Sequence, residues 1–409
     1  MTSACRFCAA PLHRTFVDLG EMPLANAYPG SIEEADREPR YPLHARVCDR
    51  CMLVQVDDVV TPQELFSDYA YFSSYSSSWV DHARKFAETA VQHLGLGSDS
   101  LVLEVASNDG YLLQHFRGAG VPVLGVDPAA NVAKVAIEAG IPTDVAFFGV
   151  AAAKRLVTRG VQADLLVANN VFAHVPDLND FTAGLAIALK PGGVVSIEVP
   201  HLLKLIERVA FDTIYHEHYS YFSLISAERV LAAHGLVVFD VEQLPTHGGS
   251  LRIWAGHGDV RRSCSARLET LRAEEAAVGL GAPDVYAGFA AQVERCRRSL
   301  IDFLTKAREA GQTVVAYGAA AKGNTLLNSC AVHSQDVAYV VDRSPHKQGR
   351  LLPGSHLPIH HPDQVAETRP DYLLVLPWNL RSEILDQMAH IRSWGGRFVI
   401  PVPEVEVIS

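Results

Sequence analysis

One short segment, residues 211–222, carries acid–base or phenolic side chains at almost every position. Its centre reads Tyr215-His216-Glu217-His218, and neither a helical nor an alternating period explains the spacing. Histidine is the simplest general base near neutral pH because its ordinary pKa is about 6.5, and an adjacent carboxylate orients the ring or raises that pKa. The segment is therefore the best candidate for catalysis. A polar loop with one structural histidine, or a His-x-His metal pair lacking an evident third ligand, are the alternatives.

Two cysteine pairs, Cys5 with Cys8 and Cys48 with Cys51, have the spacing that lets each pair put two thiolates on one metal ion. Together they complete the tetrahedral four-sulfur set that Zn²⁺ favours. Four protein ligands leave no open position for catalysis, so the predicted zinc is structural. Free thiols or a redox pair are the alternative. Residues 9–47 between the pairs are expected to contain turns at their prolines.

Residues 101–116 are predicted to form a buried apolar strand, a tight polar turn at 107–110 and the first turns of an amphipathic helix. At the carboxyl end of a parallel strand the backbone can approach a ligand, and the next helix presents unpaired N–H groups. An ordinary structural corner explains this stretch equally well when it stands alone. The candidate ligand-binding residues here are Glu104, Ala106, Asn108 and Gly110.

Features downstream favour ligand binding. A second buried strand ends at Asp127, an acid placed to hydrogen-bond the hydroxyls of a ribose. A further strand ends at Asn169 and Asn170, and a Lys-Pro-Gly-Gly turn at 190–193 precedes the strand 194–199. This ordered series resembles the class I S-adenosylmethionine (SAM) methyltransferases. The resemblance implies an α/β, Rossmann-like core with SAM as cofactor.

Two other stretches offer substrate contacts. Residues 68–78 set three tyrosines among serines, which suits a loop that closes over a ligand, although a solvated connector is the plainer interpretation. The turn at 246–250 contains two glycines and would let neighbouring side chains line a pocket, or simply form a hairpin. The candidates in these stretches are Tyr69, Tyr71, His247, Ser250 and Arg252.

A second α/β unit begins near residue 313, where a strand runs into Gly318 and a helix. Asp342 ends the next strand, about 20 residues beyond the glycine loop, as the acid of a dinucleotide site would. Lys322 at the helix start could meet a phosphate, with Asn324 beside it. A structural repeat of strands and helices is the alternative.

The length of 409 residues exceeds the roughly 250–300 at which single cores stop growing. We expect a zinc-binding domain at 1–65, a methyltransferase domain at 66–258 and a C-terminal Rossmann-like domain at 259–409. The net charge of −11 argues against nucleic acids and anionic membranes as partners. The chain lacks an apolar run of about 18 residues and begins without an apolar signal region, so a cytoplasmic location is expected.

The joint occurrence of these features resembles the deoxysugar C-methyltransferases, which act on nucleotide-linked 4-keto-6-deoxysugars. The resemblance covers essentially the whole chain and includes Ala173-His174, His247-Gly-Gly and Gly318-x-x-x-Lys322. It implies SAM in the middle domain, and a nucleotide sugar, expected to be TDP-linked, between the middle and C-terminal domains. Methylation of ring carbon C3 or C5 would follow formation of an enolate.

The resemblance also implies roles for individual residues. His218 is the expected base, and Glu217 is its electrostatic partner or a ligand of the sugar. Hydrogen bonds to the enolate or the sugar are expected from three further groups, namely Tyr71, His174 and Tyr215.

The sequence departs from the family pattern at two positions. Ala106 stands where glycine is common, which is tolerable if the backbone there does not need a positive φ. His216 lies next to the proposed base, so the choice between His216 and His218 stays open, although the motif position favours His218.

A competing class is an NAD(P)H-dependent ketoreductase, or a bifunctional enzyme on the same sugars. It is motivated by Asp342 and by the strand–loop–helix that begins at Thr313. In either class we expect a monomer or a small homo-oligomer.

Overall fold

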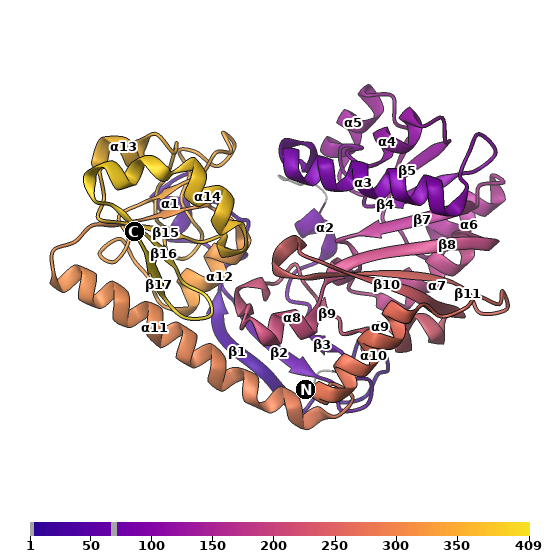
Figure 1. The fold of residues 1–409 in the computed structure, drawn as a ribbon, viewed down its shortest axis with the longest axis horizontal. Coiled ribbons are helices and arrows are strands. Elements are labelled where there is room, and N and C mark those ends of the chain that lie inside the picture. The colour runs from indigo at the N-terminus through magenta and orange to yellow at the C-terminus, as the bar shows by residue number, and fades with distance from the viewer. Residues whose placement is uncertain (1–3, 67–71) are drawn as a thin grey trace.

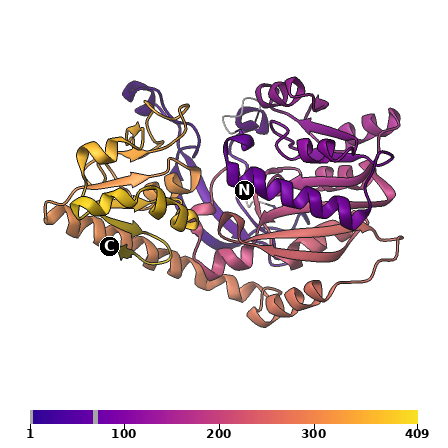
Figure 2. The same ribbon diagram turned by 45° about the horizontal axis from the view of Figure 1, so that its top comes forward.

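The computed structural model describes residues 4–66 and 72–409, and these residues form three β-sheets. Figure 1 shows two lobes that diverge upward, with strand β1 and helix α11 along their shared base. The second view, turned by 45°, shows the same separation of the lobes (Figure 2). The α/β class expected from the sequence is confirmed. Tyr69 and Tyr71 lie outside the described residues.

The first sheet is antiparallel and has the order β1-β2-β3-β9. Residues 9–47 were expected to contain turns at their prolines, and they also supply the two longest strands of this sheet, which were not predicted. Its last strand comes from the distant segment that follows His218. Its strands are β1 (Arg14–Met22), β2 (Tyr41–Val47), β3 (Val54–Gln55) and β9 (Ser220–Tyr221), and α1 (Ile32–Ala35) and α2 (Pro62–Phe66) accompany them.

The second sheet has the order β10-β11-β8-β7-β4-β5-β6, and only β11 runs against the other strands. This is the strand order of the class I methyltransferase fold. All four residues of β4 are buried, as expected of a central parallel strand covered on both faces. The strands are β4 (Val102–Val105), β5 (Val123–Asp127), β6 (Thr143–Val145), β7 (Ala163–Asn169), β8 (Leu189–Pro200), β10 (Leu236–Leu244) and β11 (Ser250–His257).

Helices cover both faces of the second sheet, with α3, α4 and α5 on the upper face in Figure 1. The longest of them, α3, starts at the side-chain cap Ser76 and ends at Gly95 in a left-handed conformation. The helical elements are η1 (Ser73–Tyr75), α3 (Ser77–Leu94), α4 (Leu113–Gly118), α5 (Ala130–Glu138), α6 (Val150–Thr158), η2 (Phe172–His174), α7 (Leu178–Ala188), α8 (Leu202–Glu207), η3 (Phe211–Thr213), α9 (Leu224–Ala233) and η4 (Thr246–Gly248).

The third sheet has the order β14-β13-β12-β15-β16-β17, and only β17 is antiparallel to its neighbour. Its strands are β12 (Val314–Tyr317), β13 (Val340–Val341), β14 (Ile359–His360), β15 (Tyr372–Val375), β16 (Arg397–Ile400) and β17 (Glu406–Ile408). The helical elements from residue 266 onward are α10 (Ala266–Val278), η5 (Pro283–Gly288), α11 (Phe289–Glu309), α12 (Ala321–Ser329), α13 (Gln364–Thr368), η6 (Trp378–Leu380), α14 (Arg381–Gln387) and η7 (Ala389–Trp394).

The loop after β1 connects the N-terminal sheet to the C-terminal lobe. The Tyr28 hydroxyl donates to the Ala319 carbonyl at 2.7 Å, and the Asn324 side chain donates to the Ala25 carbonyl at 2.5 Å. Thr325 in the same helix donates to the carbonyl of Ile214, two residues before His216, at 3.1 Å. The lobes therefore meet beneath the segment that carries the candidate base. No helix among the described residues is long and apolar enough to cross a membrane.

Candidate active site and metal centre

The turn after β4 has the strained backbone of a ligand-binding loop. Ala106 has a φ of 56°, Asn108 a φ of 50° and Gly110 a φ of 81°, all in the left-handed region. The condition set for Ala106, that its φ need not be positive, is therefore not met. At Gly110 an added Cβ would lie 3.0 Å from the Ile141 side chain, so glycine is required there by space as well as by φ.

Asp127, at the end of β5, holds this turn in place. One carboxylate oxygen accepts from the Asn108 N–H at 2.9 Å and the other from the Ala129 N–H at 2.8 Å. Asp127 is only 4% exposed, and burial raises its pKa. The Asn108 side-chain oxygen in turn accepts from the Ser73 N–H at 2.9 Å, so η1 lies directly on the turn.

Other polar groups at the carboxyl ends of the strands are buried with open hydrogen-bonding capacity. Within the described residues, neither carboxylate oxygen of Glu104 has a hydrogen-bond partner, nor does the side-chain oxygen of Asn169. Burial, together with the charges of Asp127 and Asp109, raises the pKa of Glu104 well above its usual value. Asn170 has a φ of 52°, and its N–H donates to a β8 carbonyl, which turns the chain away from the sheet.

His218 has a defined tautomer. Its Nδ1 lies 2.9 Å from the carbonyl oxygen of Thr213, which can only accept, so Nδ1 carries the proton. Nε2 is then unprotonated and carries a lone pair, and the hydroxyl of Tyr215 donates a hydrogen bond to it at 2.7 Å. Burial lowers the pKa of His218 well below its usual value, so the ring is neutral at neutral pH. A neutral imidazole whose Nε2 accepts a hydrogen bond from a hydroxyl can accept a proton once that bond is released.

His174, on η2, faces His218 with 4.6 Å between ring centroids. Burial lowers the pKa of His174 to about 4, and its Nδ1 has no partner among the described residues. The ring centroid of His247 lies 5.2 Å from that of Trp79, and the φ of His247 is 55°. Partial desolvation by neighbouring groups lowers the pKa of His247 to about 4, although part of its side chain is exposed to solvent. These histidines are therefore neutral hydrogen-bonding groups at physiological pH.

The neighbours of His218 in the chain point elsewhere. His216 lies against β2, with its Nε2 3.3 Å from the Pro42 carbonyl. The Glu217 carboxyl accepts from the Asn26 amide at 2.8 Å, and burial raises its pKa to about 7. The structure thus separates the two candidate bases, with His216 directed at the N-terminal sheet and His218 at His174.

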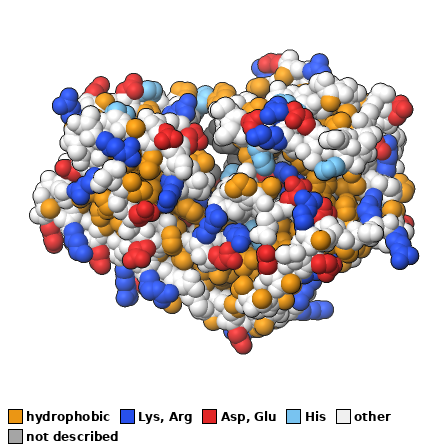
Figure 3. Space-filling model, in the orientation of Figure 1, with side chains coloured by type: hydrophobic (Ala, Val, Ile, Leu, Met, Phe, Trp, Pro, Cys, Tyr) orange, Lys and Arg blue, Asp and Glu red, His pale blue; other side chains and the backbone are white. Residues whose placement is uncertain are grey.

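The C-terminal lobe contributes a cation, Lys322, and an indole, Trp378, next to His247. Lys322, at the start of α12, lies 4.7 Å from the Trp378 ring centroid and 3.5 Å from the His247 carbonyl. Burial lowers the pKa of Lys322. The Trp378 indole donates to the buried carboxylate of Asp212 at 2.7 Å. The space-filling view is hollowed between the two lobes, and histidine side chains border the hollow (Figure 3).

Three predicted substrate contacts are buried and have structural partners. Ser250 is 1% exposed and donates to the Thr246 carbonyl at 3.0 Å. Arg252 is 4% exposed and pairs with Glu198 at 2.7 Å. Asn324 is 1% exposed and donates to the N-terminal segment. Their assignment as substrate ligands stays a prediction.

Asp342, which ends β13, repeats the arrangement of Asp127. Its carboxylate accepts from the Ala319 N–H at 2.7 Å and from the Ser344 N–H at 2.8 Å. Each acid thus joins the loop after one strand to the start of the loop after the next. The carboxylate of a Rossmann-like unit can serve this backbone role whether or not it also binds a ribose.

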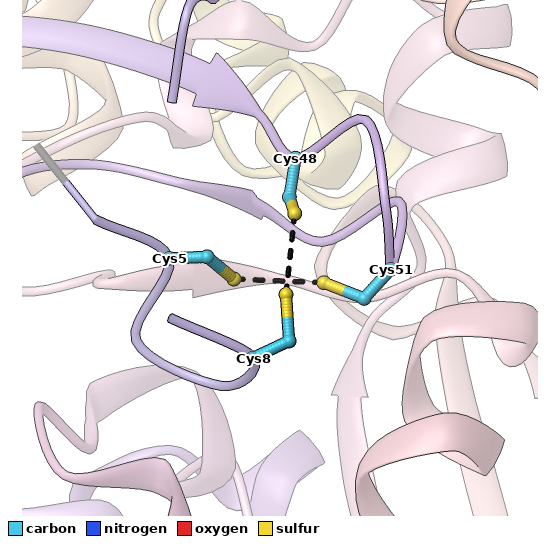
Figure 4. A group of neighbouring side chains, drawn as sticks. All are labelled: Cys5, Cys8, Cys48 and Cys51. Atoms are coloured by element: carbon cyan, nitrogen blue, oxygen red, sulfur yellow. Dashed lines mark hydrogen bonds between the residues drawn. The ribbon is translucent and has the colours of Figure 1, made fainter. Parts of the chain in front are cut away.

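The four paired cysteines form the metal centre. Their sulfur atoms all lie within 4.8 Å of one another and point to a common centre (Figure 4). Cys5 and Cys51 are 3.5 Å apart, as are Cys8 and Cys48. A tetrahedral Zn²⁺ with Zn–S bonds of about 2.3 Å needs sulfurs roughly 3.8 Å apart, so the donor set fits zinc.

Sequence reasoning missed several groups that shape the site, namely Asn26, Glu198, Asp212, Thr213 and Trp378. Their partners are remote in the chain or are backbone atoms. Asn26 is 191 positions from Glu217, and Trp378 is 166 from Asp212.

The fold and the site define a methyltransferase with an added metal centre, and comparison with known families agrees. Three family models match in chain order. They are a zinc binding domain at residues 5–66, a methyltransferase domain at 79–241 and a C-methyltransferase C-terminal domain at 245–403.

Individual relatives narrow the class. The chain is 38% identical to the C-methyltransferase NovU of Streptomyces niveus over 405 residues, which is 99% of this chain and 96% of that protein. It therefore belongs to the C-methyltransferase family, which confirms the resemblance found in its motifs. A ubiquinone biosynthesis O-methyltransferase of Methylobacterium sp. (strain 4-46) is 30% identical over 118 residues, 26% of this chain and 46% of that protein.

One solved structure matches part of the chain. The magnesium protoporphyrin IX methyltransferase of Synechocystis PCC 6803 is 15% identical and covers 44% of this chain and 80% of its own, with a TM-score of 0.33. That score is too low to support an inference about this protein.

Proposed function

We propose that the protein transfers a methyl group from SAM to C3 or C5 of a nucleotide-linked 4-keto-6-deoxysugar, with TDP as the expected nucleotide, in cytoplasmic deoxysugar biosynthesis. The family supports methylation of carbon. The observation that carries the proposal is the state of His218, a buried neutral imidazole whose Nε2 lone pair accepts a hydrogen bond from the Tyr215 hydroxyl.

Carbon methylation needs a base. A ring carbon next to a ketone becomes nucleophilic when its proton is removed, because the charge is delocalised onto the carbonyl oxygen. The Nε2 of His218 would accept this proton once the Tyr215 hydroxyl, now 2.7 Å away, rotates toward the developing enolate oxygen. The nearby His174 would add a second neutral group beside the sugar. Methylation of oxygen or nitrogen would need less of this apparatus.

The loop after β4 fits SAM. SAM supplies an electrophilic methyl group on a positively charged sulfur, and it also carries an ammonium group. Glu104 and Asn169 offer buried oxygen atoms without partners in the described part of the chain, beside the acids Asp109 and Asp127. A cationic ligand would compensate this concentration of carboxyl groups. Glu104, Asn108, Gly110, Asp127 and Asn169 are therefore the residues we expect to hold it.

A hydrogen-exchange experiment tests the base. The enzyme is incubated with a TDP-4-keto-6-deoxysugar in heavy water without SAM, and deuterium incorporation at each ring carbon is followed. We expect exchange at one carbon in the wild type and in His216→Asn, and none in His218→Asn. Calorimetry should show unchanged SAM affinity in both variants. Exchange retained in His218→Asn and lost in His216→Asn would transfer the role to His216.

The ketoreductase alternative rests on Asp342 and the parallel strands around it. Titration with NADPH and with TDP separates the two proposals. Saturable NADPH binding would favour a reductase or a bifunctional enzyme. TDP binding without NADPH binding, weakened in Lys322→Ala, would favour a nucleotide-sugar site in the C-terminal lobe.

A further inference from the structure

The first cysteine pair is bound to the segment that follows His174. In the knuckle Cys5–Cys8, the Arg6 guanidinium donates to the Pro176 carbonyl at 2.9 Å. In the reverse direction, the Asn179 side-chain amide donates to the Phe7 carbonyl at 2.9 Å. The side chain of Arg6 is only 8% exposed. The residues just after η2 are thus hydrogen-bonded to the metal knuckle from both sides.

The second cysteine pair is joined to the segment that carries His218. The chain leaves the knuckle Cys48–Cys51 and directly forms β3, which pairs with β9. Gln55 lies opposite Ser220 in this pairing, and the Val56 N–H donates to the Tyr219 carbonyl at 3.1 Å. Tyr219 follows His218 immediately, so the position of the base along the strand is set by this short ladder.

Gln55 connects the two knuckles at the metal. Its side chain is 2% exposed, donates to the Cys5 sulfur at 3.2 Å and accepts from the Arg6 N–H at 2.9 Å. Groups that hydrogen-bond to metal ligands fix the orientation of those ligands. Here the same residue belongs to the strand that pairs with β9, so the metal ligands and the active-site segment share one hydrogen-bonded unit.

We infer that the zinc centre positions the two active-site histidines, His174 through the first knuckle and His218 through the second, with Arg6 and Gln55 as the positioning residues. The inference rests on the proposed function, because it assigns both histidines to the reaction. The zinc would do no chemistry, since four thiolates complete its coordination. Its effect would be geometric, and a misplacement near 1 Å lowers a rate by roughly 10²-fold.

The first test measures amide hydrogen exchange without any substrate. Chelation of zinc from the wild-type protein should accelerate exchange in 172–179 and 218–222 by about tenfold or more, while β12 and β15 of the C-terminal lobe keep their protection. An equal acceleration in all three sheets, or none in the two named segments, would overturn the inference. Because no substrate is present, this result is independent of which reaction the enzyme catalyses.

The second test uses Arg6→Lys, which keeps the charge but loses the fork geometry that reaches Pro176. We expect about one zinc per chain, unchanged KM for SAM, a kcat lower by about tenfold or more, and faster exchange in 172–179. Arg14→Lys is the matched control, because Arg14 pairs with Asp49 of the second knuckle at 2.8 Å and contacts neither histidine segment. An equal kcat in the two variants would contradict the inference.

Gln55→Glu and Asn179→Ala extend the test if Arg6→Lys fails to fold. Gln55→Glu keeps the size of the side chain but removes the donor to Cys5, and should accelerate both zinc loss and exchange in 218–222. Asn179→Ala removes the bond to Phe7 from the far side and should accelerate exchange in 172–179 with zinc content unchanged. Wild-type exchange in both variants would defeat the inference.

Discussion

Ala106 has a left-handed backbone conformation in the predicted SAM-binding loop, and its φ is 56°. A left-handed φ costs an L-residue roughly 1–2 kcal/mol, whereas glycine adopts it freely but loses about 0.5–1 kcal/mol more conformational freedom on folding. Ala106→Gly should therefore change the free energy of unfolding by less than about 1 kcal/mol, and β-branched Ala106→Val should lower it by more than about 1–2 kcal/mol. Urea unfolding of both variants measures the difference. A similar loss in both would mean that φ at 106 is not the controlling factor.

Tyr215 should behave as a donor and not as a base. In Tyr215→Phe the ring can keep its contact with His218, now at 4.0 Å between centroids, but the hydroxyl is lost. Loss of one donor to a developing oxyanion typically costs about 10²–10³ in kcat, so slowed but measurable solvent exchange of the substrate is expected, with unchanged SAM affinity. Abolition of exchange as complete as in His218→Asn would instead assign the proton transfer to Tyr215.

Among single residues, the sequence predicted those that belong to a recognisable local motif. The cysteine spacing predicted the metal centre, which the structure confirms. The dense titratable segment drew attention to His218, but the sequence could not separate it from His216. The alternation that sends His216 toward Pro42 depends on a local backbone held by Thr213, and no spacing rule expresses it.

Among the elements, helix α10 holds the active-site segment in place, which its sequence does not indicate. Glu275, on α10, is fully buried and accepts from the His201 ring at 2.8 Å and from the Leu224 N–H at 2.7 Å. Between these two residues the chain makes the excursion that contains α8, η3 and His218, and the Leu202 N–H donates to the Phe222 carbonyl across its base. Glu275 therefore closes both ends of the active-site excursion.

Removing this carboxylate should be costly. Glu275→Ala leaves a buried imidazole and a helix N-terminus without their acceptor, and we expect a loss of roughly 3–5 kcal/mol of unfolding free energy. The control is Glu269→Ala on the same helix, where the exposed pair with Arg272 is expected to contribute less than about 1 kcal/mol. Chemical denaturation compares them. Equal losses would show that the position on α10, not the buried acceptor, matters.

Elements with strong local periodicity were predictable. The buried strand, turn and helix expected over 101–116 appear as β4 and α4. The strands β1 and β2 were missed because the prolines in and near them, Pro23, Pro29 and Pro42, suggested turns. Strand β1 pairs with β2, β2 pairs with β3, and β3 pairs with β9 from a distant segment. Such pairing leaves no local signature.

At the scale of the whole molecule, the region around His218 combines groups that the chain keeps far apart. Lys322 and Trp378 come from the C-terminal lobe, His174 and His218 from the middle of the chain, and Asn26 from the N-terminal segment. The sequence predicted the contributing units but not their orientation. Contacts such as Tyr28 with Ala319, 291 positions apart, determine that orientation and can only be read from the folded chain.

The burial of neutral His174 and His218 should make the free energy of unfolding fall in acid. Burial lowers the pKa of His174 to about 4 and holds that of His218 well below its usual value, whereas the unfolded chain would titrate near 6.5. Below pH 6.5 the unfolded state therefore binds more protons than the folded state, and each histidine lowers the free energy of unfolding by at most about 1.4 kcal/mol per pH unit as the pH falls. This contribution to stability is complete above pH 6.5 and is lost toward the folded pKa.

Glu217 acts in the opposite direction. Its pKa is raised from 4.5 to about 7, so its contribution to stability is present below pH 4.5 and is lost as the pH rises through 7. His174 and His218 act in one direction, whereas Glu217 and the acids Glu104 and Asp127, whose pKa values burial also raises, act in the other. We expect His174 to add to any fall in melting temperature between pH 6.5 and 4.5. His174→Gln should make this dependence shallower, whereas His13→Gln, at an exposed position, should leave it unchanged. Calorimetric melting across this pH range provides the measurement, and parallel curves for His174→Gln and the wild type would show that His174 is protonated alike in the folded and unfolded states.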